Sequence, residues 1–393
     1  MKNPFEFGRE LGVEEIVDRE AEIAEVKATI EQGGKLFLIG PRRYGKTSIL
    51  RAAQDRLEAQ DAVVLRHDAE SYPSLDLLVN ALVVDAAKQL KGSIEKVGDQ
   101  VRKFFSVLRP ELNFSVTERE WTAKLGVTVS DVPDRQITLL LQALDGLEAL
   151  ARAQQKHRPV GLVIDEFQKV IEIGGKAAEA NIRAAIQRHR RVGYVFAGSK
   201  TQLLASMITD AARPFYRLGS SRFIGSVPRP EFIRFLEKKF LEGRFRIDDS
   251  VADLILDLAQ EVPYNVQMLA HACWESLRAK PKNEPAVLNE SVVQNAIEQL
   301  VRQYDPFYTQ LWNGLTGIQQ KTLILTIAEG GSNLQSIKAI RAIGKGPSTV
   351  RRSLGALMDR GILRQEESGG GIRMRFEDPF FAKWIARFAP RIQ

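Results

Sequence analysis

Short apolar runs alternate with amphipathic stretches between residues 35 and 227 of the chain. Each apolar run is bounded by glycine or polar residues, which is typical of a buried strand. Buried strands are therefore expected at residues 35–40 (KLFLIG), 62–65, 160–164 and 194–197, with a fifth strand at 222–227. Apolar residues at helical spacing predict helices over 46–58, 75–90, 136–154 and 177–190. This alternation predicts an α/β fold with a parallel sheet that helices cover on both faces.

The pattern changes outside these elements. Residues 93–135 alternate between polar and apolar around 112–129, which predicts a β-hairpin insertion. From residue 229 to about residue 300 the chain is expected to be purely helical, and the last part to combine helices with a glycine-rich turn and a strand. We therefore expect an α/β core over residues 1–228, a helical domain over 229–305 and a C-terminal domain over 306–393.

Composition places the chain among ordinary globular proteins, with 44% hydrophobic and 27% charged residues. The sequence has no apolar run of about 18 residues, and its charged N-terminus lacks the apolar core of a signal peptide. We therefore expect no membrane contact. Cys273 is the one cysteine, which excludes an intrachain disulfide and fits a reducing compartment. A cytoplasmic location is expected.

The positive charge is concentrated at one end of the chain. The whole chain carries a formal charge of +7, and residues 311–393 contain 13 Lys and Arg against 6 Asp and Glu. The excess of seven in this segment equals the net charge of the chain, so the remaining residues balance. This distribution indicates a C-terminal domain that faces a polyanion.

A phosphate-binding loop follows the first expected strand. The sequence fits the pattern G-x-x-x-x-G-K-[ST] at every position, over Gly40, Pro41, Arg42, Arg43, Tyr44, Gly45, Lys46 and Thr47. The glycine-rich turn lets backbone N–H groups converge on the phosphates, and the next helix directs its positive end toward them. We expect Lys46 to bridge the β- and γ-phosphates of ATP and Thr47 to ligate Mg²⁺. Ser48, the next helical residue, is expected to belong to the same nucleotide site.

Two adjacent carboxylates follow the expected strand at 160–164. Charges at the end of a buried apolar strand cost free energy unless they take part in binding or catalysis. We expect Asp165 to hold the Mg²⁺ shell and Glu166 to polarise the attacking water. The alternative interpretation is a strand end capped by solvated acids. Downstream of the loop, the pair favours a hydrolase over a GTPase-type switch or a P-loop kinase.

These motifs resemble the archaeal-type ATPase family, within the AAA+/STAND group of P-loop ATPases. The resemblance runs through nearly the whole chain and is carried by NPFEFG at 3–8, VDRE at 17–20, GPRRYGKTSIL at 40–50, LVIDEFQ at 162–168, FAGS at 196–199 and RFEDPFFAKW at 375–384. It implies that the N-terminal segment, with Asp18 and Arg19, packs on the adenine. It also implies that Ser199 is the sensor-1 polar residue.

Two segments depart from the family pattern. Members often carry Pro-x-Tyr-Gly-Arg, which presents an arginine near the γ-phosphate, and the corresponding stretch here is RPFYR. The resemblance implies Arg217 as the closest match and Arg213 as the second, acting across subunits in a ring or within one closed chain. A solvated surface arginine is the alternative. The lid motif Gly-x-Pro reads Glu261-Val-Pro263 here, so the implied lid contacts to nucleotide are Pro263 and Tyr264.

The expected C-terminal helices and strands resemble a winged helix-turn-helix. Helices are expected over 317–329, from residue 333 and over 347–360, with a two-stranded wing around the turn at 368–371. In such a module the third helix enters the major groove and the wing touches the DNA backbone. The candidates for DNA contact are Lys345, Arg351, Arg352, Arg373 and Arg375. The alternative is a winged helix that binds protein or its own ATPase core.

We expect an ATP-driven molecular switch with slow, Mg²⁺-dependent hydrolysis. Two other interpretations stay open. One is a DNA-binding regulator in which ATP is mainly a structural clamp. The other is an oligomerising signalling or defence protein whose tail binds protein. The expected partners are ATP and ADP, together with duplex DNA, copies of the same chain or a partner protein according to the interpretation.

Overall fold

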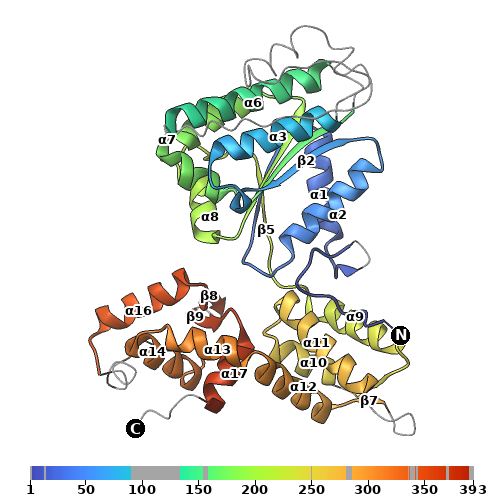
Figure 1. Cartoon of the computed structure of the whole chain (residues 1–393), viewed down its shortest axis with the longest axis vertical. Coiled ribbons are helices and arrows are strands. Elements are labelled where there is room, and N and C mark those ends of the chain that lie inside the picture. The colour runs from blue at the N-terminus through green and yellow to red at the C-terminus, as the bar shows by residue number, and fades with distance from the viewer. Residues whose placement is uncertain are drawn as a thin grey trace. The chain divides into compact units, whose positions relative to one another are not determined.

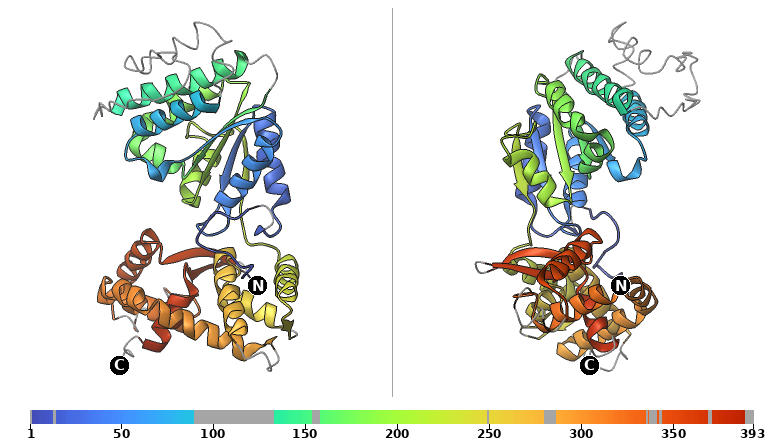
Figure 2. Two further views of the ribbon diagram at one scale, coloured as in Figure 1. Left: turned by 45° about the vertical axis from the view of Figure 1, so that its right-hand side comes forward. Right: turned by 90° about the vertical axis from the view of Figure 1, so that its left-hand side faces the viewer.

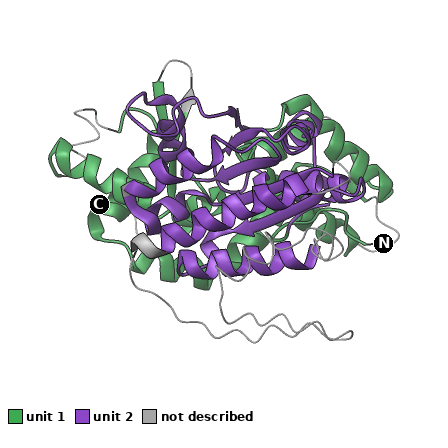
Figure 3. Cartoon of the chain, turned by 90° about the horizontal axis from the view of Figure 1, so that it is seen from above, with its two compact units in different colours: residues 1–9, 226–393 green, residues 10–225 purple. Residues whose placement is uncertain are grey.

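The computed structural model describes residues 2–12, 15–89, 133–153, 158–248, 250–279, 286–334, 336, 341, 344–368 and 371–388. The chain forms two compact units, one of Glu10–Gly225 and one of Met1–Arg9 with Ser226–Gln393 (Figure 3). It therefore passes between the units twice, after Arg9 and after Gly225. The expected hairpin at 93–135 lies outside the described residues except for 133–135, which open helix α6. The division into 1–228, 229–305 and 306–393 stays a prediction.

A five-stranded sheet forms the centre of the unit 10–225. Its strands are β1 (Lys35–Ile39), β2 (Val63–Asp68), β3 (Val160–Asp165), β4 (Val192–Gly198) and β5 (Ser220–Phe223), in the order β2-β3-β4-β1-β5. Every neighbouring pair is parallel, which confirms the predicted α/β class with a parallel sheet. The prediction for β5 was wrong in its bounds, because all four residues of this edge strand are exposed and give no apolar signal.

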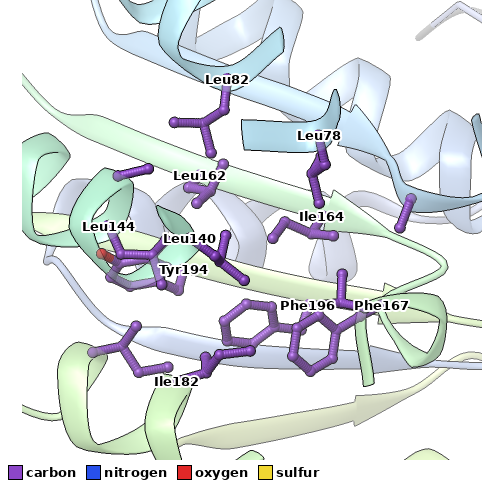
Figure 4. Close-up of a cluster of buried hydrophobic side chains, with 14 of the residues drawn as sticks. Leu78, Leu82, Leu140, Leu144, Leu162, Ile164, Phe167, Ile182, Tyr194 and Phe196 are labelled. Atoms are coloured by element: carbon purple, nitrogen blue, oxygen red, sulfur yellow. The ribbon is translucent and has the colours of Figure 1, made fainter. Parts of the chain in front are cut away.

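Four helices cover one face of the sheet. They are α3 (Leu75–Gln89), α6 (Pro133–Ala153), α7 (Gln168–Ile186) and α8 (Thr201–Thr209), and α3 lies beside α6 in Figures 1 and 2. Their apolar side chains form one cluster with alternate residues of the strands, including Leu162, Tyr194 and Phe196 (Figure 4). Burial of this cluster supplies most of the driving force that holds the layers together.

The opposite face packs against α1 (Glu20–Glu31) and α2 (Lys46–Glu58). Gly161 and Gly193 allow α1 to approach the sheet closely. A Cβ at Gly161 would lie 2.8 Å from the Ile30 side chain, and one at Gly193 would lie 2.4 Å from the Ile30 Cα. Because side chains alternate along a strand, these glycines face away from the cluster that contains their neighbours Leu162 and Val192.

Several elements differ from the expectations. Helix α7 starts at Gln168 rather than 177. The prediction missed its first turns because Gly175 takes a non-helical φ of 67° and divides the helix at a kink. Helices α1 and α8 were not predicted. The region 229–300 was expected to be purely helical, yet it contains β6 (Arg246–Ile247) and β7 (Val287–Leu288), which pair in parallel. Strands of two residues are too short for a period of two to be recognised.

In the other unit, four helices carry most of the structure between 229 and 303. They are α9 (Arg229–Glu242), α10 (Val251–Leu258), α11 (Pro263–Arg278) and α12 (Glu290–Gln303). The N-terminal segment packs on α11, since Asn3 Nδ2 donates to the His271 carbonyl at 3.1 Å and to Glu275 at 2.9 Å. The ring of Phe5 is fully buried and lies 4.7 Å from that of Phe240.

The C-terminal part contains α13 (Asp305–Asn313), α14 (Gly317–Ala328), α16 (Pro347–Asp359), the antiparallel strands β8 (Leu363–Ser368) and β9 (Gly371–Phe376), and α17 (Pro379–Phe388). A capping box between Thr316 and Gln319 starts α14. The helix expected from residue 333 lies largely outside the described residues. Among the described helices, none has both the length and the apolar character that a membrane crossing requires.

Candidate nucleotide site

The loop between β1 and α2 has a backbone that only certain residues accept. Gly45 has a φ of 88° and Arg43 a φ of 70°, both in the left-handed region. Gly40 lies against Ile224 so closely that a Cβ would come within 2.7 Å of its carbonyl oxygen. The loop ends at Gly45, directly before α2, and the first N–H groups of this helix have no partner within the helix. Such a helix end attracts anions, which fits the predicted phosphate site.

Lys46 is buried although it carries a charge, with 5% of its surface exposed. Its Nζ donates to the carbonyl of Pro41 at 3.0 Å, so the side chain folds back over the loop. Tyr44 is also buried, whereas Arg42 and Arg43 are exposed. Since Lys46 is a buried cation above a loop that suits anions, its position fits a contact with phosphate oxygens.

Thr47 and Asp165 meet across 118 positions of sequence. The Thr47 hydroxyl donates to Asp165 Oδ2 at 2.8 Å, and Asp165 Oδ1 accepts from the backbone N–H of Glu166 at 2.9 Å. Burial raises the pKa of Asp165, the Thr47 hydrogen bond opposes that shift, and repulsion from Glu166 adds to it. A hydroxyl and a carboxylate oxygen side by side are hard donors of the kind that Mg²⁺ prefers, so these residues fit that ion.

Glu166 is held by donors on two other residues. Its Oε2 accepts from the Ser199 backbone N–H at 3.1 Å, from the Ser199 hydroxyl at 2.8 Å, and from the Gln168 amide. Burial would raise the pKa of Glu166, but the hydrogen bonds from Gln168 and Ser199 and the charge of Lys46 together lower it. Glu166 also has a φ of 48°, a strained backbone region for a glutamate.

Two residues of this edge were missed in the sequence analysis. Gln168 is 2% exposed, and its place two positions after Glu166 in LVIDEFQ was the available signal. Glu70 lies in η2 (Ala69–Ser71), which follows β2, and its carboxylate pairs with Arg42 at 2.7 Å. Arg42 Nε also donates to the Ser199 hydroxyl at 3.4 Å. No local pattern marks Glu70, because its partner lies on another element.

Arg213 and Arg217 are not brought to this edge. Arg213 pairs with Glu179 of α7 and donates to the Ser206 hydroxyl at 2.9 Å. The Arg217 guanidinium lies 5.1 Å from the Tyr216 ring centroid and is exposed. Strand β5 opens at Ser220 beside Leu36, so Arg217 precedes the start of the sheet, whereas the loop follows the end of β1. The five residues of β1 separate the two edges by about 16 Å.

The N-terminal residues of this unit lie close to α2. The backbone N–H of Leu11 donates to the Ser48 hydroxyl at 3.1 Å. Arg19 is buried and donates to the Gly225 carbonyl at 2.6 Å, which ties the start of α1 to the chain after β5. Asp18 is exposed. Contact of Asp18 and Arg19 with adenine stays a prediction.

Pro263 and Tyr264 open helix α11 in the other unit. The Tyr264 ring meets that of Phe7 edge-on at 5.8 Å, and Phe7 also meets His271 at 5.1 Å. The two segments that the resemblance links to nucleotide, the N-terminal box and the lid motif, therefore pack against each other. Contact of Pro263 and Tyr264 with nucleotide stays a prediction.

The five basic DNA candidates differ in their surroundings. Arg373 Nε donates to the Gly330 carbonyl at 2.6 Å, and Arg375 pairs with Glu366 at 2.9 Å. Lys345, Arg351 and Arg352 are exposed on or next to α16, and their side chains form no hydrogen bond or ion pair with other described residues. Val350, Leu354 and Leu357 of α16 are buried, as the helical spacing predicts.

A family model described as an AAA ATPase domain matches residues 15–214, about half of the 393-residue chain. Among solved structures, the chain aligns with a Walker-type ATPase of Pyrococcus abyssi at 17% identity and a TM-score of 0.62, covering 98% of this chain and 99% of that one. It also aligns with the ORC1 protein of Aeropyrum pernix, solved in complex with DNA, at 15% identity and a TM-score of 0.47, covering 95% and 93%. No curated protein matches the chain. The first alignment supports a shared fold over the whole length.

Proposed function

The chain belongs to the AAA ATPase domain family, and from that premise we propose that it binds ATP with Mg²⁺ and hydrolyses it to ADP and phosphate. One observation carries this proposal. Lys46, Thr47, Asp165, Glu166 and Ser199 gather from three segments of the chain at the edge where β1, β3 and β4 end. In open parallel sheets, this is the edge at which ligands bind.

Each residue has a proposed role in hydrolysis. Lys46 contacts the β- and γ-phosphates, and Thr47 with Asp165 holds Mg²⁺, which when bound offsets charge on the phosphate oxygens. Glu166 takes a proton from water as the water oxygen bonds to the γ-phosphorus and the bond to the β–γ bridging oxygen breaks. Ser199 orients Glu166 through two hydrogen bonds. Because three donors share one Glu166 oxygen, that carboxylate is a weak base, which supports slow hydrolysis.

The switch role extends this proposal to the whole chain. Residues that the resemblance links to nucleotide occur in both units, and two connections join the units, after Arg9 and after Gly225. The state of the γ-phosphate then sets the angle between the units. If Arg217 assists hydrolysis, it does so in a second copy of the chain, since β1 separates it from its own loop, and Arg213 would first have to leave its ion pair with Glu179.

The test is nucleotide binding by a Lys46→Ala variant. Loss of a buried charge-assisted contact of about 2.7 kcal/mol should weaken ATP binding roughly 100-fold. Titration with a fluorescent ATP analogue in the presence of Mg²⁺ measures the affinity, and release of phosphate measures turnover. The matched control is Lys27→Ala, a partly exposed lysine of α1, which should bind as the parent does. ATP affinity that survives in Lys46→Ala would refute the proposed site.

A second function, binding of duplex DNA, is supported by Lys345, Arg351 and Arg352. These side chains are exposed on or beside α16, in the segment that carries the basic excess of the chain. The third helix of a winged helix is the element that enters the major groove. Arg373 and Arg375 lie on β9, in the proposed wing. Their side chains already form contacts within the unit, so we expect them to contribute less to DNA binding.

Salt-dependent binding of duplex DNA tests this second function. Arg351→Ala/Arg352→Ala should weaken binding of any duplex and lower the slope of log affinity against log salt by about 2. The matched control is Arg278→Ala/Arg302→Ala, which removes two exposed arginines of α11 and α12. Equal binding by the two double variants would exclude α16 as the contact. A parent protein with no duplex binding would favour the interpretation in which the tail binds protein.

A further inference from the structure

We propose that Arg42, within the phosphate-binding loop, supplies positive charge to the γ-phosphate of ATP bound by its own chain, and that Glu70 holds this arginine until ATP binds. The inference rests on the proposed ATPase function and assigns a catalytic residue beyond it. It gives the site a cation in addition to Lys46 without any contribution from a second copy of the chain.

The first argument is the position of the Arg42 guanidinium. Its Nε lies 3.4 Å from the Ser199 hydroxyl, which in turn donates to Glu166 at 2.8 Å. Arg42 is thus separated from the proposed general base by a single hydroxyl group. A guanidinium beside the base and the loop lies where negative charge develops during phosphoryl transfer, and it remains charged at any working pH.

The second argument comes from the other arginines considered for this role. Arg213 is engaged by Glu179 and Ser206, and Arg217 lies over the Tyr216 ring, just before β5 and toward the edge at which the strands begin. About 16 Å of β1 lies between that edge and the loop, farther than one arginine side chain extends. Arg42, by contrast, lies in the phosphate-binding loop itself, so it needs no change of backbone conformation to reach the proposed site.

The third argument concerns Glu70 as the partner of Arg42. The two side chains are 63% and 49% exposed, and an ion pair this open to water is easily exchanged. Glu70 itself is fixed in place, because its backbone N–H donates to Asp68 at 2.9 Å and Asp68 lies beside Asp165 in the sheet. A γ-phosphate offers the guanidinium more charge and a bidentate geometry, so it displaces the carboxylate.

The affinities for ATP and ADP test the contact with the γ-phosphate. Arg42→Ala should weaken ATP binding about 10-fold and leave ADP binding unchanged, because ADP lacks the group that Arg42 contacts. In the same variant, kcat should fall about 100-fold. The matched control is Arg51→Ala, an exposed arginine of α2 that pairs with Asp55 and Glu10, and it should match the parent in all three quantities. Equal changes in ATP and ADP affinity, or an unchanged kcat, would overturn the proposal.

Glu70→Gln tests the holding role from the other side. Removing the competing carboxylate should strengthen ATP binding about 5-fold without changing ADP binding. If Glu70→Gln weakens ATP binding or leaves it unchanged, Glu70 does not restrain Arg42. The Lys46→Ala variant separates the two proposals. If Lys46→Ala loses binding of both ATP and ADP while Arg42→Ala keeps binding of ADP, the proposed nucleotide site is supported. If the parent protein binds no ATP, the proposed function itself is wrong.

A mixing experiment decides whether Arg42 acts in its own chain. Arg42→Ala and Lys46→Ala proteins are combined in equal amounts, and turnover is compared with that of each alone. Both changes damage the same site when Arg42 acts within one chain, so no activity is recovered. Recovery of turnover in the mixture would mean that an intact Arg42 serves a neighbouring chain, and would overturn the assignment.

Discussion

The two edges of the central sheet each hold a carboxylate that accepts several hydrogen bonds, and they hold it differently. At the edge where the strands begin, Glu148 of α6 accepts from the backbone N–H groups of Arg190 at 2.9 Å, Arg191 at 3.0 Å and Val192 at 3.0 Å. At the edge where the strands end, Glu166 accepts from the hydroxyl of Ser199 and the amide of Gln168 as well as from one backbone group.

The neighbouring groups extend this contrast. His189 bridges Asp145 at 2.9 Å and the Tyr194 hydroxyl at 2.7 Å, so the first edge forms a closed set of hydrogen bonds. At the second edge the backbone is strained at Arg43 and Glu166, and burial raises the pKa of Asp165. Backbone donors cannot turn away, whereas side-chain donors can exchange one partner for another. The first edge is therefore suited to structure and the second to chemistry.

The sharpest test of this contrast is Glu166→Gln. An amide cannot take the proton from water, so kcat should fall about 1000-fold or more while ATP affinity changes little. Phosphate release and analogue binding measure the two quantities. Glu172→Gln, an exposed glutamate of α7 paired with Lys200, is the control. Persistence of turnover in Glu166→Gln would mean that another group is the base.

The matching test at the first edge is Glu148→Ala. Three backbone N–H groups lose a shared charged acceptor, so the free energy of unfolding should fall by about 3 kcal/mol. Urea denaturation measures the loss, and turnover per folded molecule should equal that of the parent. A Glu148→Ala variant that is as stable as the parent but has reduced turnover would show that this edge also serves catalysis.

Acid should remove the contribution of Glu148. Burial opposes ionisation, but hydrogen bonds from the backbone N–H groups of Arg190, Arg191 and Val192 and from Arg152 lower its pKa below the ordinary value of 4.5. A lowered folded-state pKa contributes stability above pH 4.5 that is lost as the pH falls through the folded-state value. The stability difference between parent and Glu148→Ala should therefore shrink from pH 7 toward pH 3. A constant difference would show that the charge is not involved.

The smallest effect, of opposite sign, is expected for Asp165→Asn. The pKa of Asp165 is raised, so ionising this carboxyl destabilises the folded state. The destabilisation sets in as the pH rises above the ordinary value of 3.8. At pH 7 the nucleotide-free variant should be more stable by about 1 kcal/mol, even though it loses the proposed Mg²⁺ ligand. Thermal unfolding with and without ATP and Mg²⁺ checks both parts. Destabilisation without nucleotide would contradict the burial argument.

The sequence was most informative where a function depends on residues that are adjacent in the sequence. The loop from Gly40 to Thr47 and the pair Asp165–Glu166 are local patterns, and both could be proposed as parts of one site before the fold was known. Glu70 could not be found, because its role arises from a contact with Arg42 on another element. The pairing of Arg213 with Glu179 likewise has no local signature, so its engagement away from the loop became visible only in three dimensions.

The errors in the fold have physical reasons of the same kind. Two glycines, Gly174 and Gly175, interrupt the apolar period of α7 and concealed its first turns. The exposed strand β5 has no buried face, so its pattern resembles that of a loop. In both places, tertiary packing outweighs the local preference of the chain.

The N-terminal segment has a consequence for how the protein is made. Asn3 is hydrogen-bonded to a residue 268 positions later in the chain, so this segment waits for a helix that is translated much later. At 5 to 20 residues per second, that interval is roughly 10 to 50 seconds. The unit 10–225 can form during this time, while the aromatic side chain of Phe5 waits for its partner Phe240 in α9 and that of Phe7 waits for Tyr264 in α11.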